Sequence, residues 1–493
     1  MTTRRQFVTA LGSAAVTAAV WPNRKLLANS VRNVSPSLPF TPIPTPMPTL
    51  LEQQQVFVDL RFGMLSYFNM STFQDREWAD PSAVATTFAP KHLDVAQWAT
   101  VAKSANMTWG CLTVKHHDGF CLWPTATDSM SVRQAGVPDV VRSYVDEFRA
   151  QGLKVGFQFS MLDQRQHIER YSLTPGKIEL IKEQLRELLT NYGDVAVLVF
   201  EGWNVPWARL SYDGLPFQEI YQHIKTLQPN CLVCELNGIR YPGYGLHYTD
   251  LKPFKANSGQ VYPVVSGTPG CALMNLNHQR WFWQQRDLNT DPVAVKTVVD
   301  QWLTPFNDRR YTVLLNVPPN RDGKLSSNYV RRLAEIGSVW KHPGPAARLL
   351  PHPVVTTLSL LRGKTIRASP TVDAYGPDLL NDGDDQLLWV AMFNQQPGWA
   401  EVDLGETRSF NMVSFAEGVG RRADYPVSRV KNFAFKRWDG SNWVTFASGT
   451  TVKAGTILRV PRVSAQRIRF EVDTGGVSGW ISEISVYDEP DEL

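Results

Sequence analysis

Little in this sequence suits nucleic-acid, redox or metal chemistry. Fifty basic and 46 acidic side chains leave a net charge of only +4 in 493 residues, and no long basic block is present, which argues against nucleic acid as a partner. Only five cysteines occur. Cys231 and Cys234 form a C-x-x-C motif, but its strand-like context and the lack of a second such pair favour structural cysteines. We therefore expect neither a metal nor an organic cofactor at the main site.

Long hydrophobic runs are also absent, so we expect no stable membrane span. Near the N-terminus, Arg4 and Arg5 precede a short run rich in Ala and Val. This pattern predicts a signal peptide of the twin-arginine type over residues 1–30, with a plain secretory signal or an uncleaved anchor as alternatives. The proline-rich residues 31–56 predict an extended linker. These features favour a bacterial periplasmic or secreted protein.

Residues 57–345 alternate strand-like runs with amphipathic helical patterns. The clearest helix covers residues 177–193, where Ile181, Leu185 and Leu188 share one face and Gly193 ends the pattern. Helices between successive strands imply right-handed crossovers and a parallel sheet. The pattern predicts a (β/α)8 barrel. Its eight candidate strands cover residues 62–70, 108–117, 154–162, 195–202, 231–237, 246–251, 271–277 and 311–319.

The pattern changes near residue 345. Beyond it, short alternating runs are separated by turns rich in Gly, Asp and Asn, which predicts an all-β sandwich over residues 350–490. We expect this domain to be accessory and to carry no catalytic residue. Within it, the acidic stretch at residues 381–385 is either a structural calcium loop or an ordinary turn.

Polar and aromatic residues collect at the predicted carboxyl ends of the barrel strands, where barrel enzymes carry their active sites. Six strands that end in this way favour an active site over isolated buried polar groups. Carboxylates among histidines and aromatic rings are typical of glycoside hydrolases, which need a nucleophile or base and an acid. The chain has no phosphate loop, G-x-S-x-G elbow or H-E-x-x-H motif. The strand-end residues include Tyr67, Asn69, Glu77, Trp78, His116, His117, Asp118, Gln158, Asp163, Glu201, Glu235, Trp281, Trp283 and Asn316.

Several stretches resemble the α-L-fucosidases of glycoside hydrolase family 29. They include FGMLSYFNMSTF, KHHDGF, LVFEGW and YTVLLNVPPNRDGKLSSNYVRRLAEIG, in the order of the family, within residues 57–342. Downstream, NDGDDQLLWVAM, WAEVDLG and WISEISVYD resemble a discoidin-like sandwich. The resemblance implies an exo-α-L-fucosidase that hydrolyses fucosylated oligosaccharides or glycoconjugates by retaining double displacement, without a cofactor.

The resemblance also implies roles for the substrate-binding residues. His116 and His117 are expected to hold fucose hydroxyls, because neutral imidazole can both donate and accept a hydrogen bond. Glu77 and Trp78 match a pair that contacts the sugar. Trp283 is expected to line the sugar site, and Asp118 to orient a histidine.

Three positions depart from the family pattern. Glu201 occupies the place of the aspartate nucleophile, and its extra methylene extends its reach by about 1.5 Å, while misplacement by about 1 Å can cost about a hundredfold in rate. Tyr67 replaces a histidine and, although its side chain is longer, is expected to bind the substrate through a hydrogen bond to a sugar hydroxyl. Glu235 is the nearest match to the general acid, although a structural acid at the strand end is an alternative. These departures leave open a fucose-binding pseudoenzyme and a hydrolase for another sugar.

Overall fold

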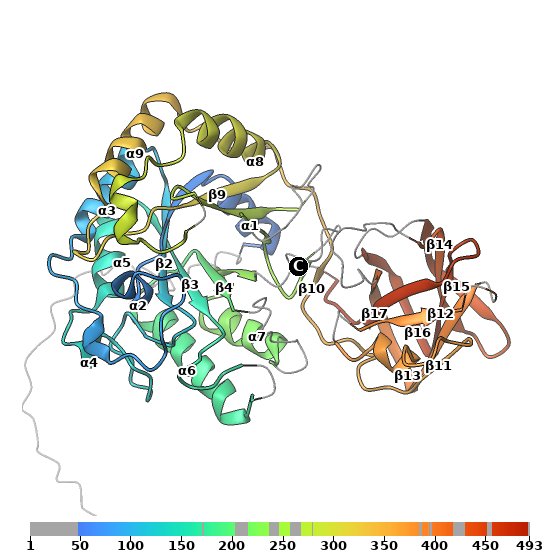
Figure 1. Cartoon of the computed structure of the whole chain (residues 1–493). Helices are drawn as coiled ribbons and strands as arrows, with labels where there is room; N and C mark the ends of the chain where they lie inside the picture. Colours follow the sequence, from blue (N-terminus) through green and yellow to red (C-terminus); the bar gives the residue numbers. More distant parts are fainter. Residues whose placement is uncertain are drawn as a thin grey trace, which may run out of the picture. The chain divides into compact units, whose positions relative to one another are not determined.

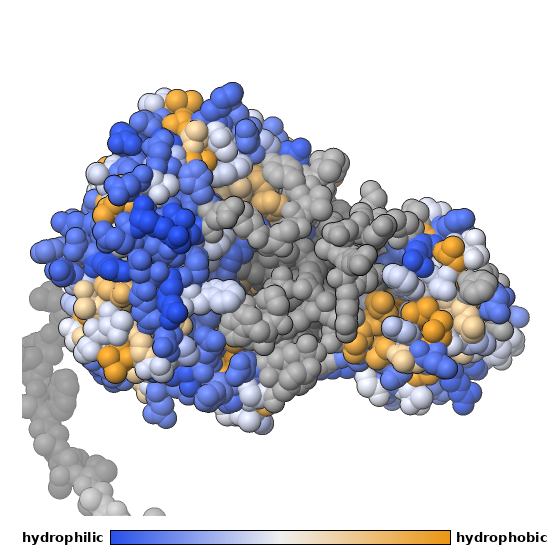
Figure 2. All heavy atoms as spheres, in the orientation of Figure 1, coloured by the Kyte–Doolittle hydropathy of each residue, from blue (hydrophilic) through white to orange (hydrophobic). Residues whose placement is uncertain are grey.

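The computed structural model describes residues 48–491 except for 170–171, 203–214, 236–245, 257–267, 279, 384–386, 393, 395–396, 418–428 and 451–455. Figure 1 shows a barrel of strands and helices and, later in the chain, an all-β region. Among the described residues, no helix combines the length and the apolar character required to cross a bilayer. On the face drawn in Figure 2, the barrel surface is largely hydrophilic with scattered apolar patches.

Eight parallel strands form the barrel, in the order β5-β4-β3-β2-β1-β9-β8-β7, which confirms the predicted fold. Between its two ends, β5 and β7, the main-chain N–H of Asp250 donates to the carbonyl of Val233 over 2.8 Å. The Asp250 carboxylate in turn accepts from the N–H of Val233, also over 2.8 Å. The strands are β1 (Phe62–Ser66), β2 (Trp109–Lys115), β3 (Lys154–Ser160), β4 (Val197–Glu201), β5 (Leu232–Glu235), β7 (Lys252–Lys255), β8 (Gly270–Asn275) and β9 (Tyr311–Asn316).

Amphipathic helices cover the outside of the barrel. In α5, Val141, Tyr144 and Phe148 are buried on one face, and the Asp139 carboxylate caps the first turn by accepting from the N–H of Arg142 over 2.8 Å. α6 begins with a proline in its first turn and stops before Gly193, whose φ is 67°. The helices are α1 (Leu50–Val58), α2 (Met70–Gln74), α3 (Val95–Ser104), α4 (Val132–Ala135), α5 (Val140–Ala150), α6 (Pro175–Asn191), α7 (Phe217–Leu227), the π-helical η4 (Thr297–Leu303), α8 (Thr304–Asp308) and α9 (Ser327–Val339). Short 3-10 turns occur at η1 (Ala85–Thr87) and η3 (Gln285–Asn289).

Side chains alternate between the two faces of the barrel sheet. Val197 and Val199 of β4 pack in the barrel interior with Cys234 and Leu273, whereas Phe200 packs with the residues facing the helices. Alternation continues to the end of each strand and determines which strand-end side chains point towards the candidate site at the carboxyl end of the barrel.

The sixth strand is not where the sequence pattern placed it. The predicted strand at residues 246–251 contains only the short β6 (Leu246–His247), which pairs with β10 (Val354–Val355) outside the barrel. Tyr248 has a φ of 52°, which ends the extended conformation. The barrel strand is β7, whose sequence KPFK carries a proline and two lysines and therefore gives little strand signal.

The C-terminal region is all-β, as predicted. Its seven strands are antiparallel, in the order β12-β17-β13-β16-β14-β15, with β11 on β13, and the core is rich in aromatic rings such as Phe415, Phe435 and Phe470. The strands are β11 (Ile366–Ala368), β12 (Trp389–Ala391), β13 (Gly398–Glu417), β14 (Asn432–Trp438), β15 (Trp443–Thr450), β16 (Thr456–Asp473) and β17 (Gly479–Tyr487), and a 3-10 turn, η5, covers Pro377–Leu380.

The stretch at residues 381–385 extends into residues that the structure does not describe, so the calcium loop stays a prediction. Its first residue, Asn381, has a structural role. The Asn381 side-chain amide donates to the carbonyls of Leu361 and Lys364, over 2.5 and 2.8 Å.

Candidate active site

Glu201 is the last residue of β4 and lies at the centre of a cluster of buried polar side chains. Only 8% of the residue is exposed. One carboxylate oxygen, Oε2, accepts from the hydroxyl of Tyr67 over 2.5 Å and from the amide of Gln158 over 2.6 Å. The other oxygen, Oε1, forms an ion pair with the ammonium of Lys255. The carboxylate is therefore fixed by donors from three other strand ends.

The surrounding charges keep Glu201 ionised. Burial alone would raise the pKa of its carboxyl, but the Lys255 ammonium lowers the pKa to about 2. Tyr67 has the opposite tendency, because burial and the nearby Glu201 charge raise the pKa of its phenol well above the usual value. Tyr67 thus remains a hydrogen-bond donor to an ionised carboxylate.

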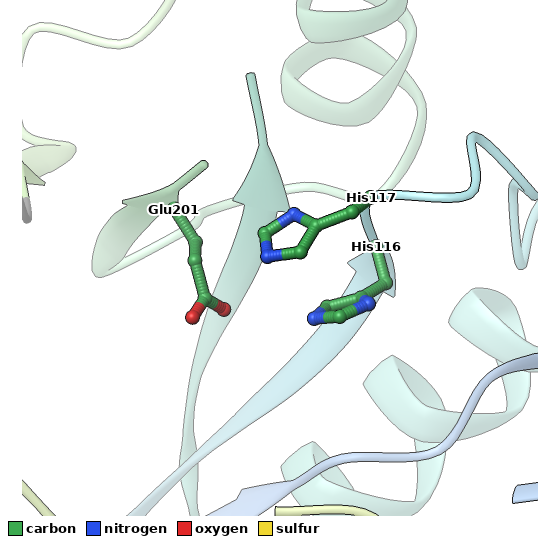
Figure 3. A group of neighbouring side chains, drawn as sticks. All are labelled: His116, His117 and Glu201. Carbon is green, nitrogen blue, oxygen red and sulfur yellow. The ribbon is translucent and has the colours of Figure 1, made fainter. Parts of the chain in front are cut away.

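His116 and His117 follow β2 and face this carboxylate. Figure 3 shows both imidazoles beside Glu201, and the rings are stacked with centroids 4.0 Å apart. Burial lowers the pKa of His117 to about 4 and the pKa of His116 well below its usual value. Both rings are therefore neutral near pH 7, and a neutral imidazole can both donate and accept a hydrogen bond.

The hydrogen bonds of His117 define its tautomer. Its Nδ1 lies 2.7 Å from the hydroxyl oxygen of Ser160, and this hydroxyl donates its own proton to the carbonyl of Leu162 over 2.7 Å. Nδ1 must therefore carry the proton that bonds to Ser160, which leaves the lone pair on Nε2. His116 differs, because its buried Nδ1 has no hydrogen-bond partner among the described residues.

Buried polar groups behind the histidines fix the turn that carries them. The Lys115 ammonium lies 3.3 Å from the Asp163 carboxylate and donates to the amide oxygen of Gln184 in α6 over 2.9 Å. Gly119 has a φ of 85°, and a Cβ there would lie 2.1 Å from Asp163, so this turn requires glycine. Asp118 accepts from the N–H of Phe120 over 3.0 Å, a bond within the turn itself. Its role in orienting a histidine stays a prediction.

An aromatic wall follows β8. Phe282 packs against Tyr67 and His116, with ring centroids 5.1 and 4.8 Å apart, and Trp281 lies 5.2 Å from Tyr67. The Lys255 ammonium is 4.7 Å from the Trp281 ring. Trp283, the tryptophan chosen from the sequence, is only 3% exposed and packs in the core cluster that faces the helices. Its contact with sugar stays a prediction.

Glu77 connects the loop after β1 to this wall. Its carboxylate accepts from the N–H of Trp281 over 2.9 Å and from the Gln284 amide over 3.2 Å, and burial raises the pKa of its carboxyl. Trp78 beside it is 50% exposed. Glu77 is thus placed beside the pocket wall, while the sugar contacts of both residues stay predictions.

Glu235 ends β5 and is fully buried, but it lies on the other face of the sheet from Glu201. In the strand register Glu235 pairs with Phe200, and residues paired across parallel strands project to the same face. Phe200 faces α7. Glu235 also interacts electrostatically with Lys252. Its role as general acid stays a prediction, because proton donation would require the side chain to reach the pocket face.

Sequence reasoning missed Lys255 as a site residue, and it left Gln158 and Trp281 without a role. Lys255 was missed because the sixth strand was placed at residues 246–251. With β7 placed correctly, alternation would have predicted that Lys255, in register with the interior residue Leu273, faces the pocket.

Comparison with known proteins identifies the family. A family model described as alpha-L-fucosidase matches residues 52–344, which is more than half of the chain. The chain belongs to the α-L-fucosidase family. A second model, described as a NedA-like, galactose-binding domain, matches residues 379–470 in the sandwich. The barrel of this fucosidase family member is therefore that of a glycoside hydrolase.

Relatives match along nearly the whole chain. A rice protein (Oryza sativa subsp. japonica) named as an α-L-fucosidase 1 is 26% identical over 94% of this chain and 88% of its own length. Arabidopsis thaliana α-L-fucosidase 1 is 27% identical over 90% and 89%. Among solved structures, a Ruminococcus gnavus GH29 fucosidase in complex with fucose aligns with a TM-score of 0.51 at 20% identity, covering 89% of this chain and 95% of that one. A Bacteroides ovatus structure described as an α-L-fucosidase aligns with a TM-score of 0.50 at 21% identity, over 91% and 78%. These two structures support the fold.

Proposed function

We propose that this α-L-fucosidase family member is an exported, retaining exo-α-L-fucosidase that removes fucose from oligosaccharides or glycoconjugates. The observation that carries the proposal is the environment of Glu201. A buried carboxylate that stays ionised, held by Tyr67 and Gln158 and faced by two neutral histidines, suits a nucleophile next to a bound sugar ring.

The reaction would proceed by double displacement. A Glu201 oxygen attacks the anomeric carbon and forms a covalent ester as the glycosidic bond breaks, and a general acid protonates the departing oxygen. Water, deprotonated by the same group acting as base, then attacks the anomeric carbon and releases fucose. Tyr67 and Gln158 both hold Oε2, so Oε1 is the oxygen free to attack once Lys255 moves aside.

The pKa of Glu201 also constrains the pH profile. A nucleophile with a pKa of about 2 is ionised at any pH used in an assay. Any acid limb in the profile of kcat/KM between pH 4 and 7 would therefore belong to another group, such as the proton donor.

A second candidate function is fucose binding without hydrolysis. Two observations favour it. The Lys255 ammonium forms an ion pair with Oε1 of Glu201, the oxygen that would attack. Among the described residues, no second carboxyl group is hydrogen-bonded to Glu201 or its partners. Glu235, the proposed acid, lies in register with Phe200 on the other face.

The deciding experiment combines turnover with binding. The purified chain is assayed on an aryl α-L-fucoside and on a branched fucosyl-oligosaccharide, the first anomer of fucose released is identified by NMR, and fucose affinity is measured by calorimetry. Release of the α-anomer supports the retaining enzyme. Fucose affinity without turnover supports the binding protein, and absence of both contradicts both functions.

Export through a twin-arginine signal remains part of the proposal and rests on the sequence around Arg4 and Arg5, which lies outside the described residues. Changing both arginines to lysine should retain the protein in the cytoplasm of a bacterial host. The measurement is cell fractionation with immunodetection, and unchanged export by the double variant would contradict this route.

A further inference from the structure

The residues around Glu201 also form a candidate cation site. In the part of the chain that the structure describes, one group of three buried His, Cys, Asp or Glu side chains places its ligand atoms within 4.8 Å of one another: His116, His117 and Glu201. Figure 3 shows the two imidazoles and the carboxylate converging from the ends of β2 and β4. Two imidazoles with one carboxylate form a donor set that binds zinc and related transition metals.

The hydrogen bond of His117 is that of an imidazole ready to bind a metal ion. Histidines that bind metals usually donate their other ring N–H to a protein acceptor, which fixes the ring orientation. His117 does so, because its Nδ1 bonds to Ser160 and the Ser160 proton is already donated to Leu162. The lone pair of Nε2 is thus available. At His116 the buried Nδ1 has no hydrogen-bond partner among the described residues.

We propose that His116, His117 and Glu201 bind a zinc-class divalent cation, and that this ion competes with the sugar ring for the pocket. The three ligands leave at least one coordination position for water. A cation there occupies the proposed nucleophile and both histidines proposed to hold the sugar, so it inhibits rather than assists hydrolysis.

Lys255 competes with the cation for Glu201. Its ammonium pairs with Oε1, and like charges repel strongly in a buried site. Binding a divalent ion therefore requires Lys255 to move away from the carboxylate. This competition gives a signature that a surface zinc site would lack: replacing Lys255 by methionine should strengthen metal binding while it removes a positive charge from the pocket.

The test is calorimetric titration of the metal-stripped full chain with ZnCl2 at pH 7, with MgCl2 as a hard-cation control. We expect one zinc ion per chain at this site and no measurable magnesium binding. His117→Ala and Glu201→Gln should each weaken zinc binding at least about tenfold, and Lys255→Met should strengthen it by about tenfold or more. His92→Ala, at an exposed histidine, is the matched control and should change nothing. Added zinc should inhibit any fucosidase activity competitively.

The proposal is overturned if zinc does not bind, or if His117→Ala and Glu201→Gln bind it as the parent does. It is also overturned if Lys255→Met weakens binding, or if only the His92→Ala control loses it. Circular dichroism verifies the fold of each variant, and Glu201→Gln, which keeps the side-chain shape, serves if His117→Ala is unfolded. The titration uses no substrate, so its result is independent of the proposed hydrolysis.

Discussion

Two glutamates of the barrel each interact with a lysine of β7, one on each face of the same sheet. Glu201 pairs with Lys255 on the pocket face, while Glu235 interacts with Lys252 on the helix face. Both lysines belong to β7, three residues apart, so alternation directs them to opposite faces. Both glutamates end adjacent strands. The two glutamates, and likewise the two lysines, are close in the fold but lie on opposite faces of the sheet.

The two pairs differ in what surrounds them. Tyr67, Gln158 and two neutral histidines accompany Glu201, whose pKa falls to about 2. On the other face, burial lowers the pKa of Lys252 to about 8, although Glu235 acts against this effect. The difference shows that the face of the sheet on which a strand-end carboxylate lies determines its neighbours, and that these neighbours determine the chemistry open to it. On the helix face, Glu235 interacts electrostatically with a buried lysine.

The largest expected effect is at Glu201. Glu201→Gln keeps the shape of the side chain but cannot attack the anomeric carbon, so hydrolysis of an aryl α-L-fucoside should fall by at least about a thousandfold. Fucose affinity measured by calorimetry should stay close to that of the parent. Turnover that survives in the variant would show that Glu201 is not the nucleophile.

On the helix face, Glu235→Gln should act on stability. Removing Glu235 takes away a charge that opposes the desolvation of the buried Lys252 ammonium, and the free energy of unfolding should fall by about 1–3 kcal/mol. Urea titration measures this change. Glu235 raises the pKa of Lys252 to its value of about 8, so in the variant the ammonium loses its proton at a lower pH than in the parent. The loss of stability should therefore be largest at low pH and should disappear by about pH 8.

The same variant decides whether Glu235 is the acid. If Glu235 donates the proton, Glu235→Gln should lose far more activity on fucosides with poor leaving groups than on those with good ones, and azide should restore turnover on the latter. The position of Glu235 on the helix face predicts instead an equal loss on both substrates. The double variant Glu235→Leu/Lys252→Met is the control and should recover most of the stability.

Glu201→Asp sharpens the comparison on the pocket face. Because Oε2 of Glu201 already accepts from both Tyr67 and Gln158, a shorter side chain would withdraw from these donors. The rate should fall by up to about a hundredfold. Steady-state kinetics on the aryl fucoside measure it. A rate equal to or above that of the parent would mean that the extra methylene is uncompensated.

The smallest expected effects are at the histidines. His116→Ala and His117→Ala should each weaken fucose binding by about 0.5–1.5 kcal/mol, the usual contribution of one hydrogen bond. His117→Ala should lower the melting temperature more than His116→Ala, since only His117 bonds to Ser160. Calorimetry and thermal melts measure both quantities. A large loss of stability with unchanged fucose affinity would make the pair structural.

Much of the pocket follows from the sequence because strand ends of a parallel barrel converge. Tyr67, His116, His117 and Glu201 were chosen as strand-end residues, and the structure brings them together. The face of Glu235 could not be predicted from the sequence, since a shift of one residue in a short strand exchanges its two faces. Lys255 could not be assigned to a strand from the sequence, because the proline and lysines of β7 interrupt the hydrophobic alternation that is typical of strands.

Asp250 connects the two end strands of the barrel, β5 and β7. Between β5 and β7 its carboxylate accepts from the N–H of Val233, in the place of a backbone carbonyl, and the same carboxylate is held from α7 by Tyr221 and Lys225 at 2.6 Å each. Closure at this point therefore depends on the main-chain bond from Asp250 to Val233, on the Asp250 side chain and on the helix that supports this side chain. Regions held by few main-chain bonds open locally at lower free-energy cost than a continuous ladder. We therefore expect amide hydrogen exchange to be faster at Val233 than in β2, with local opening of the barrel where β5 and β7 meet.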